Sequence, residues 1–167
     1  MNPRKLTWQR SMIWAGELPD NVTYPFDEVL EHTIQAQPAT STESRRIAVR
    51  YVGPMQHHFG LLGAEFIPST DDQLIICVPV STEEFVSLDR LYALAVFEAL
   101  QADPLREGLL QLGAGTLTFA YAVQHTVDST YLIFSRLLHY VVAFLNPTLE
   151  ELDEKAFKEV AEQVLRS

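Results

Sequence analysis

The residues with the clearest chemical potential lie in the segment 124–130, QHTVDST. His125, Asp128 and Ser129 are the residue types of a hydrolase triad, in which a His base activates a Ser nucleophile and an acid orients the base. However, Asp128 directly precedes a long apolar stretch, and an Asp in that place caps a helix with its carboxylate. We therefore predict that a helix starts at Ser129, that His125, Thr126, Asp128 and Ser129 form a binding tip, and that none of them is catalytic.

A second group of polar residues contains His57 and His58, within the sequence GPMQHHFG. Together with Asp71 and Asp72 they have the donor types of a metal site. Adjacent histidines on extended backbone point to opposite sides, and the chain has no H-E-x-x-H, paired-cysteine or EF-hand pattern. We therefore predict loop histidines that bind neither a metal nor another cofactor. The alternative is a small hydrolase or ligand-binding domain with a pocket formed by His57, His58 and His125.

The distribution of charge bears on the class of partner. Residues 1–50 contain six Lys/Arg and six Asp/Glu, whereas residues 51–167 contain six and sixteen, so the second part carries the whole net charge of −10. Proteins bind a phosphate backbone through Lys and Arg, so this composition argues against broad nucleic-acid binding. Arg45, Arg46 and Arg50 are interpreted as the solvated start of a strand.

The single cysteine, Cys77, lies in the apolar run QLIICVPV. No intramolecular disulfide can form, as is typical of the reducing cytoplasm, and an apolar setting predicts an unreactive thiol. The N-terminal sequence MNPRKLTWQRSM lacks the apolar core of a signal peptide, and no apolar run approaches the roughly 20 residues of a membrane span. We expect a cytoplasmic protein that does not enter the membrane.

Four segments have the composition and alternation of strands. They are RIAVRYV (46–52), LLGAEFI (61–67), QLIICVPV (73–80) and TLTFAYAV (116–123). The third is apolar at successive positions, which predicts an interior strand with both faces covered. The N-terminal residues, the last helix or a second copy of the chain are the candidates for the cover on the second face.

Helix patterns account for most of the remaining chain. They are FDEVLEHTIQ (26–35), a segment from a capping box at Ser81–Glu84 to Gln101, the segment 129–145, and a final amphipathic segment after a second capping box at Thr148–Glu151. The sequence REGLLQLGAG (106–115) is interpreted as a glycine-bearing loop. The pattern predicts an α+β domain at residues 47–147, with an N-terminal arm or subdomain at 1–46 and a C-terminal amphipathic helix at 148–167.

The order of elements and the local sequences resemble the fourth domain of translation elongation factor G, in the ribosomal protein S5 domain 2-like superfamily. The resemblance covers roughly residues 44–149. It is most specific where a strand leads into HTVDST and a long apolar helix, similar to the family's H-x-V-D-S-S. His125, Val127, Asp128 and Ser129 match that motif, with Thr130 in place of the second Ser.

The resemblance implies a four-stranded sheet, β-β-β-α-β-α, with two helices on one face and a left-handed crossover. It also implies that the 124–130 tip is exposed, since the family's tip reaches into the ribosomal decoding site. Two features depart from the family: the chain has no GTPase motif, and GPMQHHFG replaces a loop rich in Gly and Arg.

We therefore expect a non-enzymatic protein-interaction module that binds a protein partner or a second copy of itself as a homodimer. A translation-associated factor that contacts the ribosome through the 124–130 tip is the second hypothesis. The small hydrolase or ligand-binding domain is the third.

Overall fold

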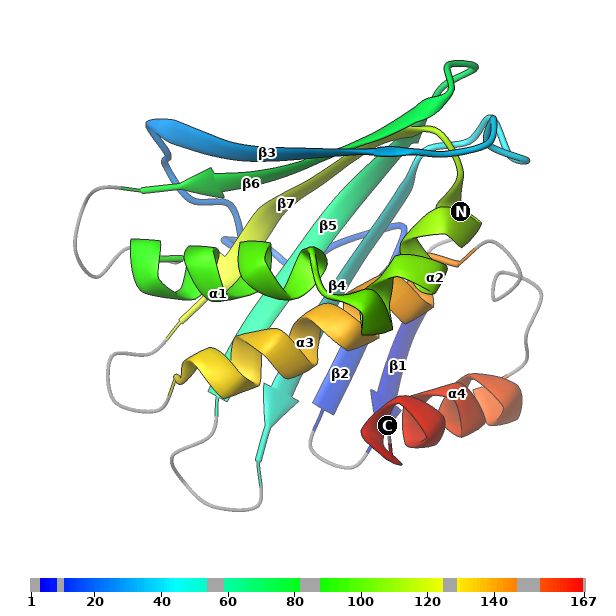
Figure 1. The fold of residues 1–167 in the computed structure, drawn as a ribbon. Coiled ribbons are helices and arrows are strands. Elements are labelled where there is room, and N and C mark those ends of the chain that lie inside the picture. Colours follow the sequence, from blue (N-terminus) through cyan, green and yellow to red (C-terminus); the bar gives the residue numbers. More distant parts are fainter. Residues whose placement is uncertain are drawn as a thin grey trace.

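The computed structural model describes residues 4–8, 11–53, 59–81, 88–124, 129–146 and 154–166. These residues form a mixed fold of one sheet and several helices, which confirms the α+β class (Figure 1). The strands are β1 (Arg4–Trp8), β2 (Ser11–Ala15), β3 (Glu28–Gln35), β4 (Arg45–Val52), β5 (Phe59–Pro68), β6 (Gln73–Val80) and β7 (Gly115–Val123). The helices are α1 (Arg90–Leu100), α2 (Asp103–Leu112), α3 (Tyr131–Phe144) and α4 (Glu154–Arg166).

The sheet has seven strands in the order β1-β2-β4-β5-β7-β6-β3. The prediction of a four-stranded sheet was therefore wrong in its size, although the four predicted strands, β4 to β7, are present at its centre. The extra strands come from the N-terminal residues, which add β1 and β2 beside β4 and β3 beside β6. Only β6 and β7 are parallel among the paired strands.

The segment 26–35 was predicted as a helix, and this prediction was wrong because Glu28–Gln35 is strand β3. Its apolar residues fit both a helical stripe and a strand. In the strand, burial alternates along the whole segment, with Leu30, His32 and Ile34 partly buried and their neighbours more exposed. Pairing with β6 over eight residue pairs stabilises the extended form, so tertiary contacts determine the conformation here.

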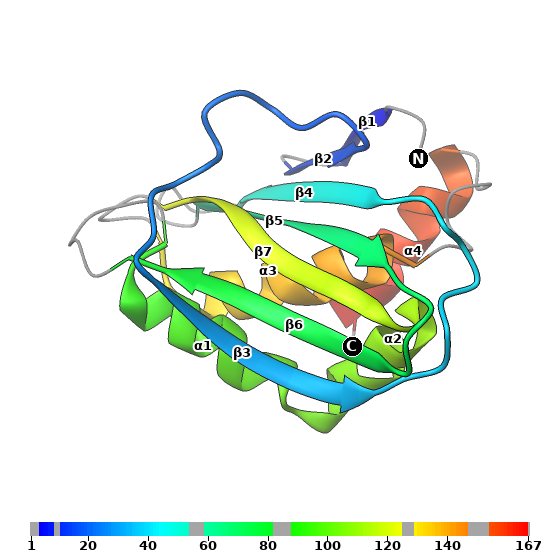
Figure 2. The same ribbon diagram turned by 90° about the horizontal axis from the view of Figure 1, so that it is seen from above.

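The helices α1, α2 and α3 cover one face of the sheet (Figures 1 and 2). The core between them and the sheet is apolar, and alternate residues of the central strands point into it. Helix α3 contributes most of one wall and packs on β4 and β5. The C-terminal helix α4 lies beside α3, and Val160 packs against the same core.

The boundaries of α1 and α2 differ from the sequence prediction. Helix α1 begins at Arg90 with Asp89 as its N-cap. Ser81 forms a parallel bridge with Asp89 and does not cap this helix. Residues Asp103–Leu112 form helix α2, where a loop was predicted, because Pro104 favours the first turn of a helix and not only its end. Gly108 is accommodated within that helix.

Helix α3 begins two residues later than predicted. Its first residue is Tyr131 and its N-cap is Thr130, whose side chain accepts a hydrogen bond from the Ile133 amide. The prediction of Asp128 as the N-cap was therefore wrong. Thr is also a favourable capping residue, and Thr130 stands two positions after Asp128 in the sequence.

The second face of the sheet is covered in part by the N-terminal segment 16–27, which crosses it between β2 and β3 (Figure 2). Val22 is buried there against Ala48 and Leu61. The Tyr24 hydroxyl lies 2.8 Å from the Pro79 carbonyl and 3.1 Å from the Phe119 carbonyl.

Tyr24 occupies the place where β6 and β7 separate. The parallel pairing of these strands ends at Cys77 and Thr118. Burial raises the pKa of the Tyr24 phenol far above its ordinary value, so the hydroxyl stays protonated and can donate to these carbonyls.

The strands of residues 1–46 lie at both edges of the same sheet as the strands of residues 47–147. The division into an arm, a core domain and a C-terminal helix stays a prediction. Within the described part of the chain, none of the helices is long and apolar enough to cross a membrane.

Candidate interaction site at the tip

Two helices begin and two strands end at one end of the sheet, at the left in Figure 1. Strands β6 and β7 end here, and helices α1 and α3 start here. We call this end the tip, defined by its described residues 88–92, 124 and 129–132. Residues 82–87 and 125–128, which directly precede residues 88 and 129 in the sequence, lie outside the described ones.

Asp89 and Gln124 join the start of α1 to the end of β7. The Asp89 amide donates to Gln124 Oε1 at 2.9 Å, and Gln124 Nε2 donates to Asp89 Oδ2 at 3.2 Å. The other carboxylate oxygen, Oδ1, accepts from the Leu91 and Tyr92 amides at 3.0 and 3.2 Å. One carboxylate therefore caps a helix and fixes the strand end that leads into the segment 125–128.

Ser129 fixes the other end of the same segment. Its hydroxyl donates to the Phe59 carbonyl at 2.8 Å, and its own carbonyl accepts from the Tyr92 hydroxyl at 2.7 Å. The Tyr92 ring stacks on Phe134 with a centroid distance of 4.9 Å. Residues 124 and 129 are thus both held by the sheet and by α1, so the segment between them starts and ends on rigid structure.

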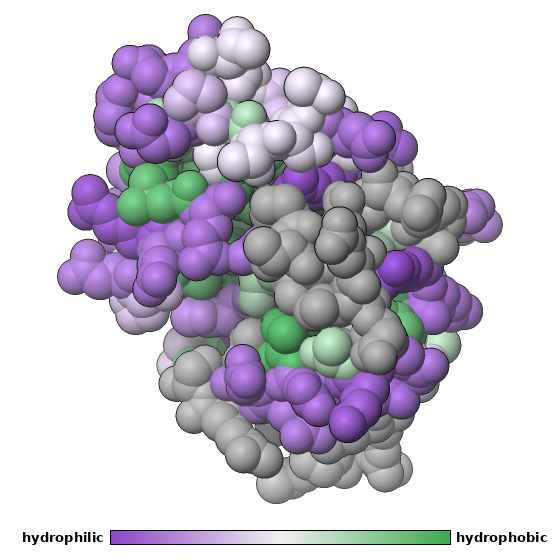
Figure 3. All heavy atoms as spheres, turned by 90° about the vertical axis from the view of Figure 1, so that its right-hand side faces the viewer, coloured by the Kyte–Doolittle hydropathy of each residue, from purple (hydrophilic) through white to green (hydrophobic). Residues whose placement is uncertain are grey.

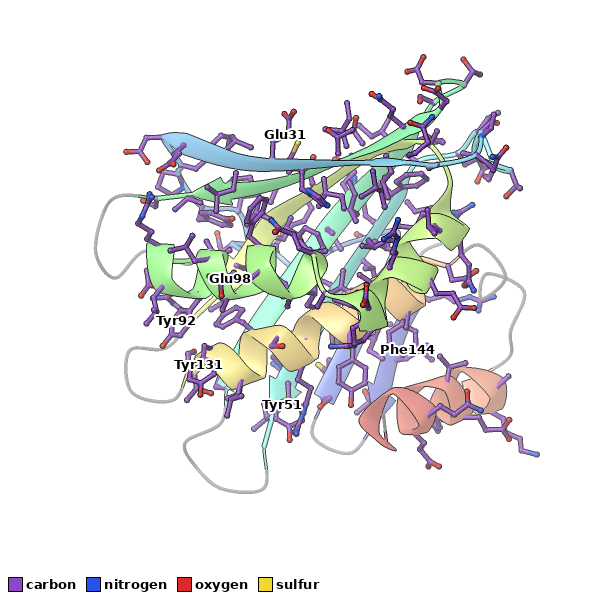
Figure 4. The ribbon with its side chains drawn as sticks, viewed as in Figure 1. Glu31, Tyr51, Tyr92, Glu98, Tyr131 and Phe144 are labelled. Atoms are coloured by element: carbon purple, nitrogen blue, oxygen red, sulfur yellow. The ribbon has the colours of Figure 1, made fainter. Side chains whose placement is uncertain are left out.

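Large apolar side chains are exposed at the tip. Leu91 is 66% exposed, Tyr131 56% and Leu132 64%. They occupy the first turns of α1 and α3. Figure 4 shows Tyr131 and Tyr92 at this end of the two helices. The opposite end of the molecule is mainly hydrophilic in its described residues (Figure 3).

Of the predicted site residues, Ser129 lies within the described part of the chain, at the tip. Ser129 is buried and forms the two hydrogen bonds given above. His125, Thr126, Asp128, His57 and His58 lie outside the described residues. Their binding roles, and the hydrolase hypothesis that requires the histidines, stay predictions.

The Ser129–Phe59 hydrogen bond nevertheless connects the ends of the two predicted loops. Ser129 directly follows Asp128, and Phe59 directly follows His58. Sequence reasoning missed the apolar side chains Leu91, Tyr131 and Leu132. A signal for two of them existed, since Tyr131 and Leu132 stand in the first turn of a helix whose buried residues begin at Ile133.

The described residues hold no group of three His, Cys, Asp or Glu side chains that could bind a metal ion. Cys77 is half-buried on the sheet face away from the helices, and burial raises the pKa of its thiol. The thiolate, which is the nucleophilic form, is therefore disfavoured.

The three arginines near the start of β4 point to different sides. Arg45 is buried at 2% exposure and donates to the Leu145 carbonyl at the end of α3. The interpretation of all three as solvated residues was therefore wrong for Arg45. Arg46 forms an ion pair with Glu65 at 2.8 Å on the opposite face.

Comparisons of the chain with protein-family models, with curated proteins and with solved structures gave no match.

Proposed function

We propose that the protein is a non-enzymatic interaction module that binds a protein partner, or a second copy of itself, through the tip. The observation that carries this proposal is the exposure of Leu91, Tyr131 and Leu132 on two helix starts. Full burial of such a side chain contributes roughly 1.5–3 kcal/mol, so three of them suffice for the centre of a specific interface.

The hydrogen bonds at the tip support the same proposal. Asp89, Gln124 and Ser129 hold the helix starts and strand ends in one arrangement before any partner binds. A preorganised surface loses less conformational entropy on binding than a flexible one.

The test is a comparison of two variants. The double substitution Leu91→Ser, Leu132→Ser removes apolar surface at the tip, and Leu110→Ser removes it from α2, where Leu110 is 42% exposed. We expect a partner captured by the wild-type protein, or the self-association measured by sedimentation, to be lost in the tip variant and kept in the Leu110 variant. Equal binding by both variants would contradict the proposal.

A translation-associated factor that contacts the ribosome is the second candidate. The order of elements from β4 to α3 supports it, because three strands, helices, a strand and a helix follow one another as in the resemblance to the fourth domain of elongation factor G. The net charge of −10 disfavours contact with RNA. Co-sedimentation with ribosomes that survives moderate salt and is lost in the tip variant would favour this candidate over the first.

A further inference from the structure

A hollow of about 380 Å³ lies on the sheet face away from α1, α2 and α3, between β1 and the segment 16–20. It is separate from the tip and from the proposed function. The residues that line it are two basic, two acidic and three apolar ones: Arg4, Lys5, Trp14, Glu17, Leu18, Pro19 and Asp20. Such a volume is at the small end of the range for ligand pockets, about 300–1,000 Å³.

The opposite charges in this hollow come from different elements. Arg4 and Lys5 belong to β1, whereas Glu17 and Asp20 belong to the segment after β2. Among the described residues, Lys5, Glu17 and Asp20 form no ion pair with one another or with another side chain. The hollow thus holds an ammonium and two carboxylates that line the same space without neutralising each other.

Trp14 forms the apolar wall of the hollow, and two cationic side chains lie beside its ring. Lys5 Nζ lies 6.0 Å and Arg50 Cζ 5.8 Å from the centroid of the Trp14 ring. Arg50 donates to the sulfur of Met12, a weak acceptor, and its Nε is buried with no acceptor. Neither cation forms an ion pair with a carboxylate within the described part of the chain.

The segment 16–20 is held in place by its backbone. Gly16 and Asn21, at its two ends, have positive φ angles of 80° and 57°. The Gly16 amide donates to the Arg46 carbonyl at 2.9 Å, and the Val22 carbonyl accepts from the Ala122 amide at 2.9 Å. Two left-handed residues and two anchors thus fix Glu17 and Asp20 opposite β1.

We propose that this hollow binds a small zwitterion of amino-acid size with an apolar side chain. The carboxylate of the ligand pairs with Lys5, its ammonium pairs with Glu17 and Asp20, and its side chain packs on Trp14 and Leu18. A zwitterion can pair with Lys5 and with the two carboxylates at the same time. A phosphate chain or another polyanion is repelled by the two carboxylates. The net charge of −10 also disfavours a polyanion.

Calorimetric titration of the full chain tests this proposal with three related probes. L-phenylalanine carries both charges, 3-phenylpropionate lacks the ammonium, and 2-phenylethylamine lacks the carboxylate. We expect L-phenylalanine to bind most tightly. Lys5→Gln should weaken its binding about two- to fivefold, the effect of one exposed ion pair, as should Glu17→Gln.

Charge-matched controls lie elsewhere on the surface. Lys155→Gln on α4 and Glu98→Gln on α1 should leave the affinity unchanged. Equal binding of L-phenylalanine and 3-phenylpropionate would overturn the proposal, since the acidic wall would then have no role. The absence of binding for all three probes would overturn it as well, and neither outcome would affect the proposal for the tip.

Discussion

Asp89 and Gln124 lie 35 positions apart in the sequence and exchange two hydrogen bonds, one through the Asp89 amide and one through its carboxylate. The same carboxylate caps α1. A single residue thus fixes the start of a helix and the end of a strand. This pair links the fold to the proposed site, because residues 125–128 begin directly after Gln124.

The Asp89–Gln124 pair predicts a measurable coupling. Asp89→Ala removes a helix cap and a hydrogen bond, and we expect it to lower the free energy of unfolding by about 1–3 kcal/mol. Gln124→Ala should cost less, because the cap remains. In a double-mutant cycle followed by urea unfolding, the two should be non-additive by about 0.5–1.5 kcal/mol. Glu98→Ala, on the exposed side of α1, is the control; strict additivity of the pair would contradict the proposed link.

Two buried tyrosines predict opposite effects of the same substitution. The Tyr24 hydroxyl reaches the Pro79 and Phe119 carbonyls, whereas the Tyr140 hydroxyl is buried with no hydrogen-bond partner in the described structure. Tyr24→Phe should therefore lower the free energy of unfolding by about 1–3 kcal/mol, and Tyr140→Phe should leave it unchanged or raise it. Thermal or urea unfolding of the two variants decides this, and equal losses of unfolding free energy would contradict the prediction.

His139 predicts a pH dependence of stability. Burial on α3 lowers the pKa of its imidazole below the ordinary value of about 6.5. The unfolded chain therefore binds a proton at this residue before the folded protein does, and stability falls as the pH drops below about 6.5. His139→Gln should show a smaller loss of unfolding free energy between pH 7.5 and pH 5.5 than the wild-type protein. An unchanged loss would contradict the assignment.

Two glycines in β5 should differ in how much a substitution by alanine destabilises the fold. A Cβ at Gly63 would lie 2.8 Å from the Ile47 carbonyl oxygen, which is backbone, next to an irregularity in the pairing with β7. A Cβ at Gly60 would meet only the ends of the Ile133 and Leu137 side chains, at 3.0 Å. Gly63→Ala should lower the free energy of unfolding by about 1–3 kcal/mol. Gly60→Ala should lower it by less, because side chains can shift. The reverse order in urea unfolding would contradict this reading.

The central strands could be predicted from the sequence, and the edges of the sheet could not. Strands β4 to β7 contain runs of β-branched and aromatic residues that favour extended backbone. In β3, Leu30 and Ile34 fit both a helix and a strand, and only pairing with β6 determines the outcome. Helix α2 was not predicted, because Gly108 and Gly113 suggested a loop. Leu105, Leu109 and Leu112 nevertheless have helical spacing and are buried.

The contacts at the two ends of the segment 125–128 could not be predicted from the sequence, and its role as a binding site stays a prediction. The segment 124–130 was identified because polar residues interrupt two apolar runs. The contacts that fix it, from Gln124 to Asp89 and from Ser129 to Phe59, join positions far apart in the sequence. Local patterns contain no information on such pairs. The exposure of Leu91 likewise depends on how α1 sits on the sheet.

Site-specific photo-cross-linking tests the central claim most directly. A benzoylphenylalanine placed at position 132 reports on the tip, and the same group at position 110 reports on α2, in the cells that make the protein. The proposed function predicts a discrete cross-linked species, to a partner or to a second copy, from position 132 and none from position 110. Cross-links from position 110 alone, or from neither position, would contradict the proposal that the tip is the binding surface.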